Sequence, residues 1–312
     1  MNALIRRNTE INKKHPKKKW IKGSTIFVIV MLAYPVFQFL LMWLGVNFNS
    51  ILLTFQAPLR GKLQFVGWDD LFRNYANLFE SFKMSSTQSM FGASLVYFVI
   101  SCLITLPIAL FFSYFIFKKI YAAGFFKVIF YLPSIIPLVV LTLVFKLSFD
   151  TNGGFLAPIL GSMGVDVASL FIGDNAKWMV WFFCIWAGIG YDVILLTAGM
   201  SRIPREILES VKMDGISSFK EFIYIIIPLT WPTITTLFIF GMMSVFNVFM
   251  QPMFLTQGQY DTMTIGLSIY QQSSGAGLNV PATLGLFCSL IGAPIIVGTR
   301  SLFNKCFKDV NY

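Results

Sequence analysis

The chain has 312 residues, of which 56% are hydrophobic and only 12% are charged. A soluble domain carries about 25% charged residues, so this composition all but excludes an ordinary soluble protein and a disordered chain. The formal net charge is +10. In a soluble protein this excess would point to nucleic acid, but here its meaning depends on where the charges lie relative to membrane spans.

Six apolar segments are long enough to cross a bilayer, whose core of about 30 Å needs about 20 helical residues. The predicted spans are Ser24 to Val46, Met90 to Phe117, Val128 to Phe145, Trp178 to Met200, Leu229 to Phe254 and Leu284 to Leu302. The first is too long for a signal-peptide core and is predicted to be retained. Pro133 and Pro137 interrupt the third. Such prolines are tolerated, because neighbouring helices or waters can satisfy the freed backbone carbonyls. The pattern predicts an all-α integral membrane protein with six transmembrane helices.

The basic residues predict the orientation of these spans. The N-terminal tail, the loops after the second and fourth spans, and the C-terminal tail together hold 18 of the 24 Lys and Arg residues. By the positive-inside rule, these segments and both termini are cytoplasmic. The basic tail fixes topology in the favoured interpretation, and contact with anionic membrane lipid is the alternative.

The spans divide the chain into five predicted regions. These are a basic cytoplasmic tail (1–23), a first transmembrane helix (24–46), an extracytoplasmic segment (47–89), a five-helix core (90–302) with a cytoplasmic loop (201–228), and a second cytoplasmic tail (303–312). The extracytoplasmic segment is too short for a separate domain, and we expect one or two helices lying at the membrane surface there.

The loop over residues 201–228 has a clear local pattern. Pro204 is suited to opening a helix from Arg205 to Met213, with Glu206 in the first turn facing the positive end of the helix dipole. Asp214 and Gly215 then end this helix, since Gly readily adopts positive φ. The loop therefore begins with one short, well-terminated helix.

A second helix is predicted directly after this stop. Ser218 and Glu221 have the spacing of a capping box, and Pro228 ends or kinks the helix just before the fifth span. A short helix, a Gly turn and a second capped helix form an exposed pair. Such a pair on one face of a membrane protein is suited to docking a partner.

The spacing of this loop resembles the signature loop, or EAA motif, of permease subunits of binding-protein-dependent ABC importers. That motif reads Glu-Ala-Ala, three residues, Gly, nine residues and Ile-x-Leu-Pro. The corresponding residues here are Glu209-Ser210-Val211, Gly215 and Ile225-Ile226-Ile227-Pro228. Ser210, Val211 and Ile227 depart from the motif, and the bulkier Val211 is expected to alter close packing.

Other segments resemble the carbohydrate branch of this family, the maltose-type permeases. They are Phe65 to Trp68, Tyr131 to Pro133, and Pro252 to Thr256, and the resemblance spans about residues 65 to 300. Gln257 to Tyr260 stands where that branch has a Gly-rich run. The resemblance implies a type I importer permease bundle in a prokaryotic inner membrane, taking part in sugar import.

The resemblance also implies partners. These are a second permease subunit, two ATP-binding cassette ATPase subunits that hold ATP and Mg, and an extracytoplasmic solute-binding protein. The residues implied in ATPase coupling are Glu206, Glu209, Asp214, Gly215 and Pro228. The sequence has no Gly-rich phosphate loop and no catalytic or metal constellation, so we expect no cofactor or metal on this chain and no enzyme activity.

Asp192 is an ionisable residue inside a predicted span, where such residues usually face a cavity or a partner. The hypothesis for the substrate path is that Asp192 accepts hydrogen bonds from sugar hydroxyls, with Tyr191, Asn247 and Gln251 as further candidates. An interhelical hydrogen bond is the structural alternative. Two other functions stay open: a permease for another small polar solute, and a proton-coupled secondary transporter that uses Asp192.

Overall fold

The computed structural model describes residues 23–59, 62–275 and 277–306. The chain divides into two units, residues 1–52 and 53–312. The first unit is dominated by one helix, in which α2 (Gly23–Gln38), the π-helical η1 (Phe39–Leu44) and α3 (Gly45–Thr54) follow without a break. This helix is 32 residues long with a mean hydropathy of 2.2, and it contains the predicted first span. The predicted basic tail lies outside the described residues.

The second unit begins with a small hairpin rather than with surface helices alone. β1 (Gln56–Leu59) pairs antiparallel with β2 (Lys62–Phe65), and α4 (Arg73–Ser81) follows. The hairpin was not predicted, because four-residue strands are too short for an alternating pattern to stand out. Asn74 anchors it: its Nδ2 donates to the carbonyls of Thr54 (2.7 Å) and Gln56 (2.8 Å), while Asn279 donates to its Oδ1 (3.1 Å).

Long apolar helices make up most of the second unit. One continuous helix consists of α5 (Ser85–Val99), the π-helical η2 (Ile100–Thr105) and α6 (Leu106–Phe117), and two further long helices are α10 (Asp174–Met200) and α17 (Asn279–Cys306). With the helix of the first unit, four described helices can each cross a membrane, or six spans if each of two bent helix pairs counts as one. The prediction of an all-α membrane protein is confirmed, apart from the hairpin.

The two bent pairs correspond to the third and fifth predicted spans. α7 (Ala123–Ile135) and α8 (Leu138–Ser148) meet at 108°. Ile136 precedes a proline and is extended (ψ 134°), as expected of a residue whose helical conformation clashes with the next ring. The third span is therefore two helices at a sharp angle, rather than one helix with tolerated prolines.

The fifth predicted span is shorter than expected. α14 (Trp231–Asn247) ends before Phe254, and α15 (Met250–Thr256) is a separate helix. Pro252 has no N–H to offer the Val248 carbonyl four residues earlier, and this carbonyl instead accepts from Thr264 Oγ1 at 2.6 Å. The proline thus accounts for the end of the long helix. α14 also meets the preceding helical segment, Ser218–Leu229, at 74°.

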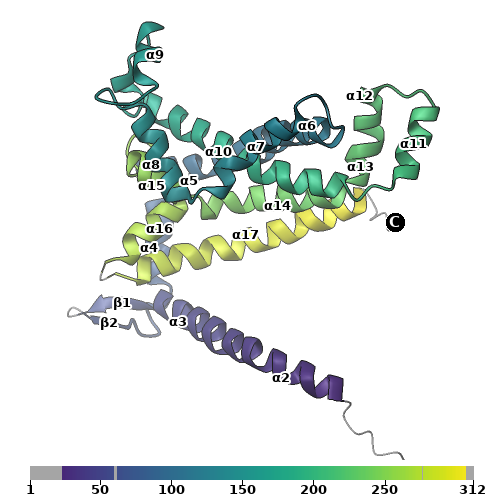
Figure 1. The fold of residues 1–312 in the computed structure, drawn as a ribbon. Coiled ribbons are helices and arrows are strands. Elements are labelled where there is room, and N and C mark those ends of the chain that lie inside the picture. The colour runs from purple at the N-terminus through teal and green to yellow at the C-terminus, as the bar shows by residue number, and fades with distance from the viewer. Residues whose placement is uncertain (1–22, 60–61, 276, 307–312) are drawn as a thin grey trace, which may run out of the picture. The chain divides into compact units, whose positions relative to one another are not determined.

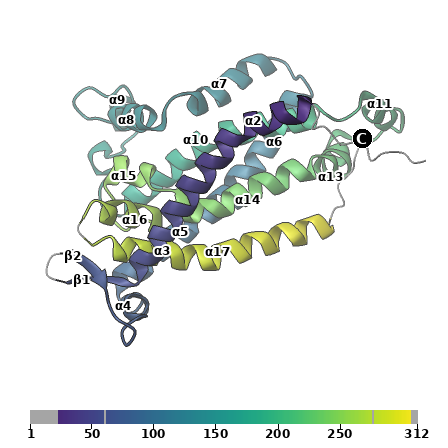
Figure 2. The same cartoon turned by 90° about the horizontal axis from the view of Figure 1, so that it is seen from below.

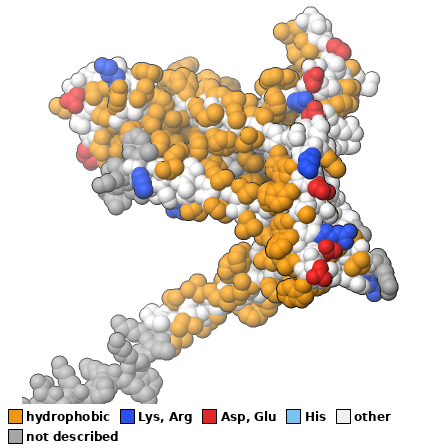
Figure 3. All heavy atoms as spheres, turned by 180° about the vertical axis from the view of Figure 1, so that it is seen from behind, with side chains coloured by type: hydrophobic (Ala, Val, Ile, Leu, Met, Phe, Trp, Pro, Cys, Tyr) orange, Lys and Arg blue, Asp and Glu red, His pale blue; other side chains and the backbone are white. Residues whose placement is uncertain are grey.

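The remaining elements are short and lie mainly at the two ends of the second unit. They are α9 (Ala157–Ser162), η3 (Val167–Ser169), α11 (Arg205–Met213), α12 (Ser218–Glu221), η4 (Phe222–Ile226), α13 (Ile227–Leu229) and α16 (Ile265–Ser273). Within this unit, α11 to α13 lie at one end of the long helices and α9 lies at the other (Figures 1 and 2). On the face drawn in Figure 3, hydrophobic side chains cover the middle of this unit, and charged side chains gather toward its ends.

α10 forms the centre of the second unit. Its Phe183, Val193 and Leu196 side chains are fully buried, and they pack against residues of α6, α8, α14 and α15. Small residues let neighbouring helices approach closely. A Cβ on Gly190 would overlap the Phe130 carbonyl of α7, and a Cβ on Gly241 would overlap Cys102 of η2.

Replacing Gly190 with Ala is expected to lower the free energy of unfolding by about 1–3 kcal/mol, because the added methyl group must push α7 away. Gly188, two residues earlier on α10, is the matched control, since a Cβ there meets only Thr105 Cγ2 at 3.5 Å, an ordinary contact. Gly188→Ala should leave stability within about 0.5 kcal/mol. Thermal unfolding of both variants in detergent checks this, and equal midpoints would show that the α7–α10 contact is not tight.

Candidate functional site

The loop over residues 201–228 has the predicted helix, turn and helix. Pro204 is the N-cap of α11, which runs from Arg205 to Met213. Gly215 follows with a φ of +67°, and a side chain there would meet open space, so backbone conformation alone selects glycine. α12, η4 and α13 then continue as one helical segment from Ser218 to Leu229. The helix bounds and the Gly turn are confirmed.

The capping box is wrong. Ser217, not Ser218, is the N-cap of α12, and its side chain makes no capping bond. Glu221 instead turns inward, where the Lys118 ammonium at the end of α6 donates to Oε1 (2.9 Å) and Oε2 (2.8 Å). A carboxylate that is removed from water needs a charged or hydrogen-bonding partner, and the Lys118 ammonium supplies it. Glu221 therefore forms this ion pair in place of the predicted capping bond at the start of α12.

Tyr114 completes this anchor. Its hydroxyl donates to the Ser218 carbonyl (3.0 Å) and lies 3.4 Å from Glu221 Oε2, while its ring lies against Phe222 with centroids 4.9 Å apart. The Glu221 side chain is 5% exposed and that of Lys118 is 28% exposed. The second half of the loop is thus fixed to α6 by a largely buried ion pair that sequence reasoning missed.

The first half of the loop presents its functional candidates outward. Glu206, Glu209 and Asp214 are exposed, whereas Pro228 is half-buried within α13. Val211, the bulky replacement in the motif, is buried and anchors α11. Two large apolar side chains beside the acids are left in the open, Met213 (88% exposed) and Phe219 (72% exposed).

Three of the four substrate-path candidates line one cavity. Asp192 and Tyr191 from α10 and Gln251 from α15 border a space of about 210 Å³, together with residues of α5, η2 and α14. The Asp192 side chain is half-buried beside this space. Tyr97 lines the same cavity, and its hydroxyl is buried without a hydrogen-bond partner in the described part of the chain. An unsatisfied buried hydroxyl beside a cavity points to water or a polar ligand.

The cavity also contains residues that the sequence did not single out. Ser101 and Ser244 face it from η2 and α14, and Gly241 lets these two elements approach. Serines are common in apolar helices, so their positions carried no signal until the helices were placed together. The site draws its hydroxyl, carboxyl and amide side chains from helices far apart in the sequence: Tyr97, Ser101, Thr105, Tyr191, Asp192, Ser244 and Gln251.

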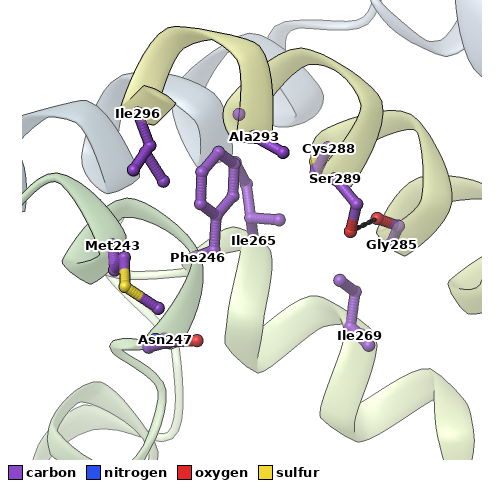
Figure 4. A pocket seen from close by; sticks show the side chains of 11 residues that line it. Met243, Phe246, Asn247, Ile265, Ile269, Gly285, Cys288, Ser289, Ala293 and Ile296 are labelled. Carbon is purple, nitrogen blue, oxygen red and sulfur yellow. Dashed lines mark hydrogen bonds between the residues drawn. The ribbon is translucent and has the colours of Figure 1, made fainter. Parts of the chain in front are cut away.

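Asn247 lies elsewhere. It borders a separate cavity of about 310 Å³ between α14, α16 and α17, whose lining is mostly apolar and includes Phe246, Ile265 and Ile296 (Figure 4). Ser289 also lines this space, but its hydroxyl already donates to the Gly285 carbonyl of its own helix (2.8 Å). The structure therefore does not bring Asn247 together with the other three candidates.

A polar cluster joins three elements at the end of the second unit opposite the loop. Asp261 accepts from Lys177 Nζ (3.1 Å) and from Ser89 Oγ (3.0 Å), so the α15–α16 connection is tied to the starts of α10 and α5. These hydrogen bonds, that of Lys177 first, lower the pKa of Asp261 from its ordinary value of 3.8. Tyr260 and Asp261 both have positive φ, so the bonds hold a backbone that is otherwise unfavourable.

The lowered pKa of Asp261 predicts a pH dependence. A carboxyl group with a depressed folded-state pKa stabilises the fold fully above its unfolded pKa, and this stabilisation disappears as pH falls through the folded value. Asp261→Asn should lower the melting temperature at pH 7 by about 1–3 °C, since the group is largely exposed. Melting curves of both proteins should converge below pH 3.8. A difference that persists at low pH would assign the effect to packing instead.

Within the described residues, no group of three or more His, Cys, Asp or Glu side chains is placed to hold a metal ion. The candidate sites offer hydrogen-bonding side chains and exposed loop residues. Their arrangement is a polar cavity among the long helices and an exposed, anchored helix pair at one end.

No protein-family model matches the sequence. The chain is 29% identical over 137 residues to the probable ABC transporter permease protein YurN of Bacillus subtilis, covering 43% of this chain and 47% of that protein. It is 28% identical over 154 residues to the multiple sugar-binding transport system permease protein MsmF of Streptococcus mutans, covering 49% and 53% of the two chains. The matched part thus spans about half the length of these curated relatives.

Longer alignments are weaker in identity but cover most of the fold. The probable ABC transporter permease protein y4oQ of Sinorhizobium fredii is 22% identical over 260 residues, covering 83% of this chain and 82% of that protein. A chain of a bacterial ABC transporter that imports alginate superposes with a TM-score of 0.75 at 20% identity, over 89% of this chain and 96% of that chain. The chain is a multi-pass membrane protein that resembles the permease subunits of ABC importers in both sequence and fold, as the loop motif predicted.

Proposed function

We propose that the chain is the transmembrane pore subunit of an ATP-driven importer, which translocates a sugar or oligosaccharide delivered by an extracytoplasmic binding protein. The observation that carries this proposal is the helix pair α11–α12, exposed on one side and fixed to α6 through Glu221 on the other. A docking element that is rigidly joined to long apolar helices is suited to transmitting a partner's motion into a membrane.

The proposal that the cargo is a sugar is based on the names of similar proteins. Several proteins to which the chain is similar are named sugar permeases, among them a lactose transport permease of Rhizobium radiobacter (28% identical over 158 residues). A bacterial alginate ABC transporter, solved in complex with an alginate pentasaccharide-bound periplasmic protein, has the same fold, with a TM-score of 0.77. These names support a carbohydrate as the cargo and a binding protein as the source.

The rest of the assembly follows as part of the proposal. A second permease subunit closes the pore, and two ATPase subunits hold ATP and Mg, so this chain is not itself an enzyme. Both termini and the loop 201–228 face the cytoplasm of a prokaryotic cell, and the segment 47–89 faces outward, as the basic residues indicate. Closure of the ATPase dimer moves the docked loops, and alternating access results.

Each loop residue has a proposed role in this coupling. Glu209, Glu206 and Asp214 offer exposed carboxylates to the ATPase groove, and Gly215 permits the turn between the helices. Pro228 sets the angle at which α13 passes into α14. Met213 and Phe219 add apolar contact area to the same surface.

The proposed substrate path passes the cavity bordered by Asp192, Tyr191 and Gln251. Carboxylate, phenol and amide groups accept and donate hydrogen bonds in the way that sugar hydroxyls require. Asn247 is left outside this contact set by its position in the apolar cavity.

The test is uptake into proteoliposomes that contain the chain with its co-purified ATPase, second permease and binding protein. We expect uptake of a labelled sugar to depend on ATP and to resist uncouplers, and Asp192→Asn to reduce it about tenfold if one charge-assisted hydrogen bond to the sugar is lost. Uptake that persists without ATP and collapses with an uncoupler would favour the proton-coupled alternative. ATP-dependent uptake of amino acids, but not of sugars, would overturn the cargo class alone.

A further inference from the structure

A basic cavity, separate from the polar cavity among the helices, is lined in part by the loop itself, through Ser201, Ile203, Arg205, Leu208 and Lys212. Its volume is about 590 Å³, and it is bordered by the end of α6, the start of α7, the end of α10, and α11. Five cationic side chains line it: Lys118, Lys119, Lys127, Arg205 and Lys212. No Asp or Glu is among its lining residues.

Most of this charge is uncompensated. Lys118 is paired with Glu221, but Lys119, Lys127, Arg205 and Lys212 make no salt bridge within the described residues. Four like charges around one space repel one another, and an anion held between them removes that repulsion. Phosphate oxygens satisfy such a cluster well, because several donors can converge on one group.

The surroundings of the cavity distinguish a lipid from a free phosphate. Lys127 lies on α7 among side chains that point outward and are apolar, such as Phe125 (64% exposed) and Val128 (60% exposed). Tyr121, in the turn before α7, is 97% exposed. A cation at the end of a membrane helix, next to exposed aliphatic and aromatic groups, is placed at the depth of lipid head groups.

We propose that this cavity binds the phosphate-bearing head group of an anionic phospholipid, whose acyl chains lie along the outward face of α7. The head group joins Lys119 and Lys127 of the α6–α7 region to Arg205 and Lys212 of α11. The lipid thereby braces α11 through Arg205 and Lys212, which are distinct from the proposed docking residues of the same helix. This inference concerns a lipid site and stands whether or not the cargo is a sugar.

The test uses the full chain in mild detergent, with the binding of phosphatidylglycerol followed by native mass spectrometry. In the variant Lys119→Gln/Lys127→Gln, the dissociation constant of phosphatidylglycerol should rise about tenfold, because two charges near the head group are lost. Arg202→Gln/Lys220→Gln is the matched control: it removes the same charge from exposed positions of the same loop that do not line the cavity, and binding should not change. Lys119→Arg/Lys127→Arg should bind as the unaltered chain does.

Several outcomes would overturn the proposal. An equal loss in both Gln variants would indicate general attraction to a basic surface. Competition by millimolar inorganic phosphate would indicate a site for a free anion, and displacement of the lipid on addition of the ATPase subunits would assign the cavity to protein contact. Loss of binding in the Arg variant as well would point to a folding defect, and it too would contradict a site defined by charge.

Discussion

Replacing Glu221 with Ala is expected to abolish more than nine tenths of ATP-driven uptake while the protein still inserts into the membrane. The substitution removes one partner of a pair in which the Glu221 side chain is 5% exposed, so Lys118 is left beside four other cations. Loss of a largely buried partner costs about 2 kcal/mol here, less than for a fully buried pair because Lys118 is 28% exposed. The loop then moves independently of α6, so that under the proposed function ATPase closure would no longer reach the spans.

The charge-swapped pair Lys118→Glu/Glu221→Lys separates the ion pair from other effects. If attraction between the two side chains fixes the loop, the double variant should recover a substantial part of the uptake that each single variant loses. ATPase activity of the assembled complex gives a second readout, since uncoupling lets hydrolysis continue without uptake. Full uptake in Glu221→Ala would show that the loop does not act through α6.

Gly215→Pro is expected to have an equally large effect, through backbone geometry. Proline fixes φ near −65°, whereas position 215 has a φ of +67°. The turn must therefore change, and α11 is displaced relative to α12. We expect the ATPase subunits to co-purify at less than a tenth of the normal yield, with uptake reduced in parallel.

Two controls make this prediction specific. Asn tolerates the left-handed backbone conformation, so the variant Gly215→Asn should retain most of the uptake. Gly164→Pro introduces the same conflict at a glycine with a φ of +81° and open space around it, in the turn that follows α9. It should leave ATPase co-purification intact. Equal loss of co-purification in both proline variants would assign the effect to general misfolding.

The variant Glu209→Lys tests the proposed docking surface itself. This exposed position contributes nothing to the buried core of the loop, so a charge reversal there changes the partner contact and not the fold. We expect ATPase binding to weaken while the melting temperature stays within about 1 °C, the range expected of a surface substitution. Unchanged co-purification would exclude Glu209 from the contact.

The features that were predicted correctly are those that local sequence determines. Apolar runs of membrane length predicted the long helices, and Pro204 and Gly215 predicted both ends of α11, because helix ends depend on a few neighbouring residues. The motif spacing carried the resemblance that the comparisons support. These signals need no knowledge of which helices are neighbours.

The features that were missed depend on contacts between distant segments. Glu221 has the spacing of a capping residue, and only the position of Lys118 on another helix shows its different use. Asn247 belongs to the same helix as Ser244, yet the two residues line different cavities, because different helices pack around each of them. Likewise, the basic residues of the loops predicted a topology, but not that five of them line one cavity.

The pair between Lys118 and Glu221 also has a consequence for the order of assembly. The two residues are 103 positions apart, so the loop cannot be fixed until the intervening helices α7, α8 and α10 are in place. Closing a long segment of chain carries an entropic cost that is recovered only when the distant contact forms. During biosynthesis we therefore expect the proposed docking surface to mature late, so that an incompletely folded chain is not yet competent to recruit the proposed ATPase partner.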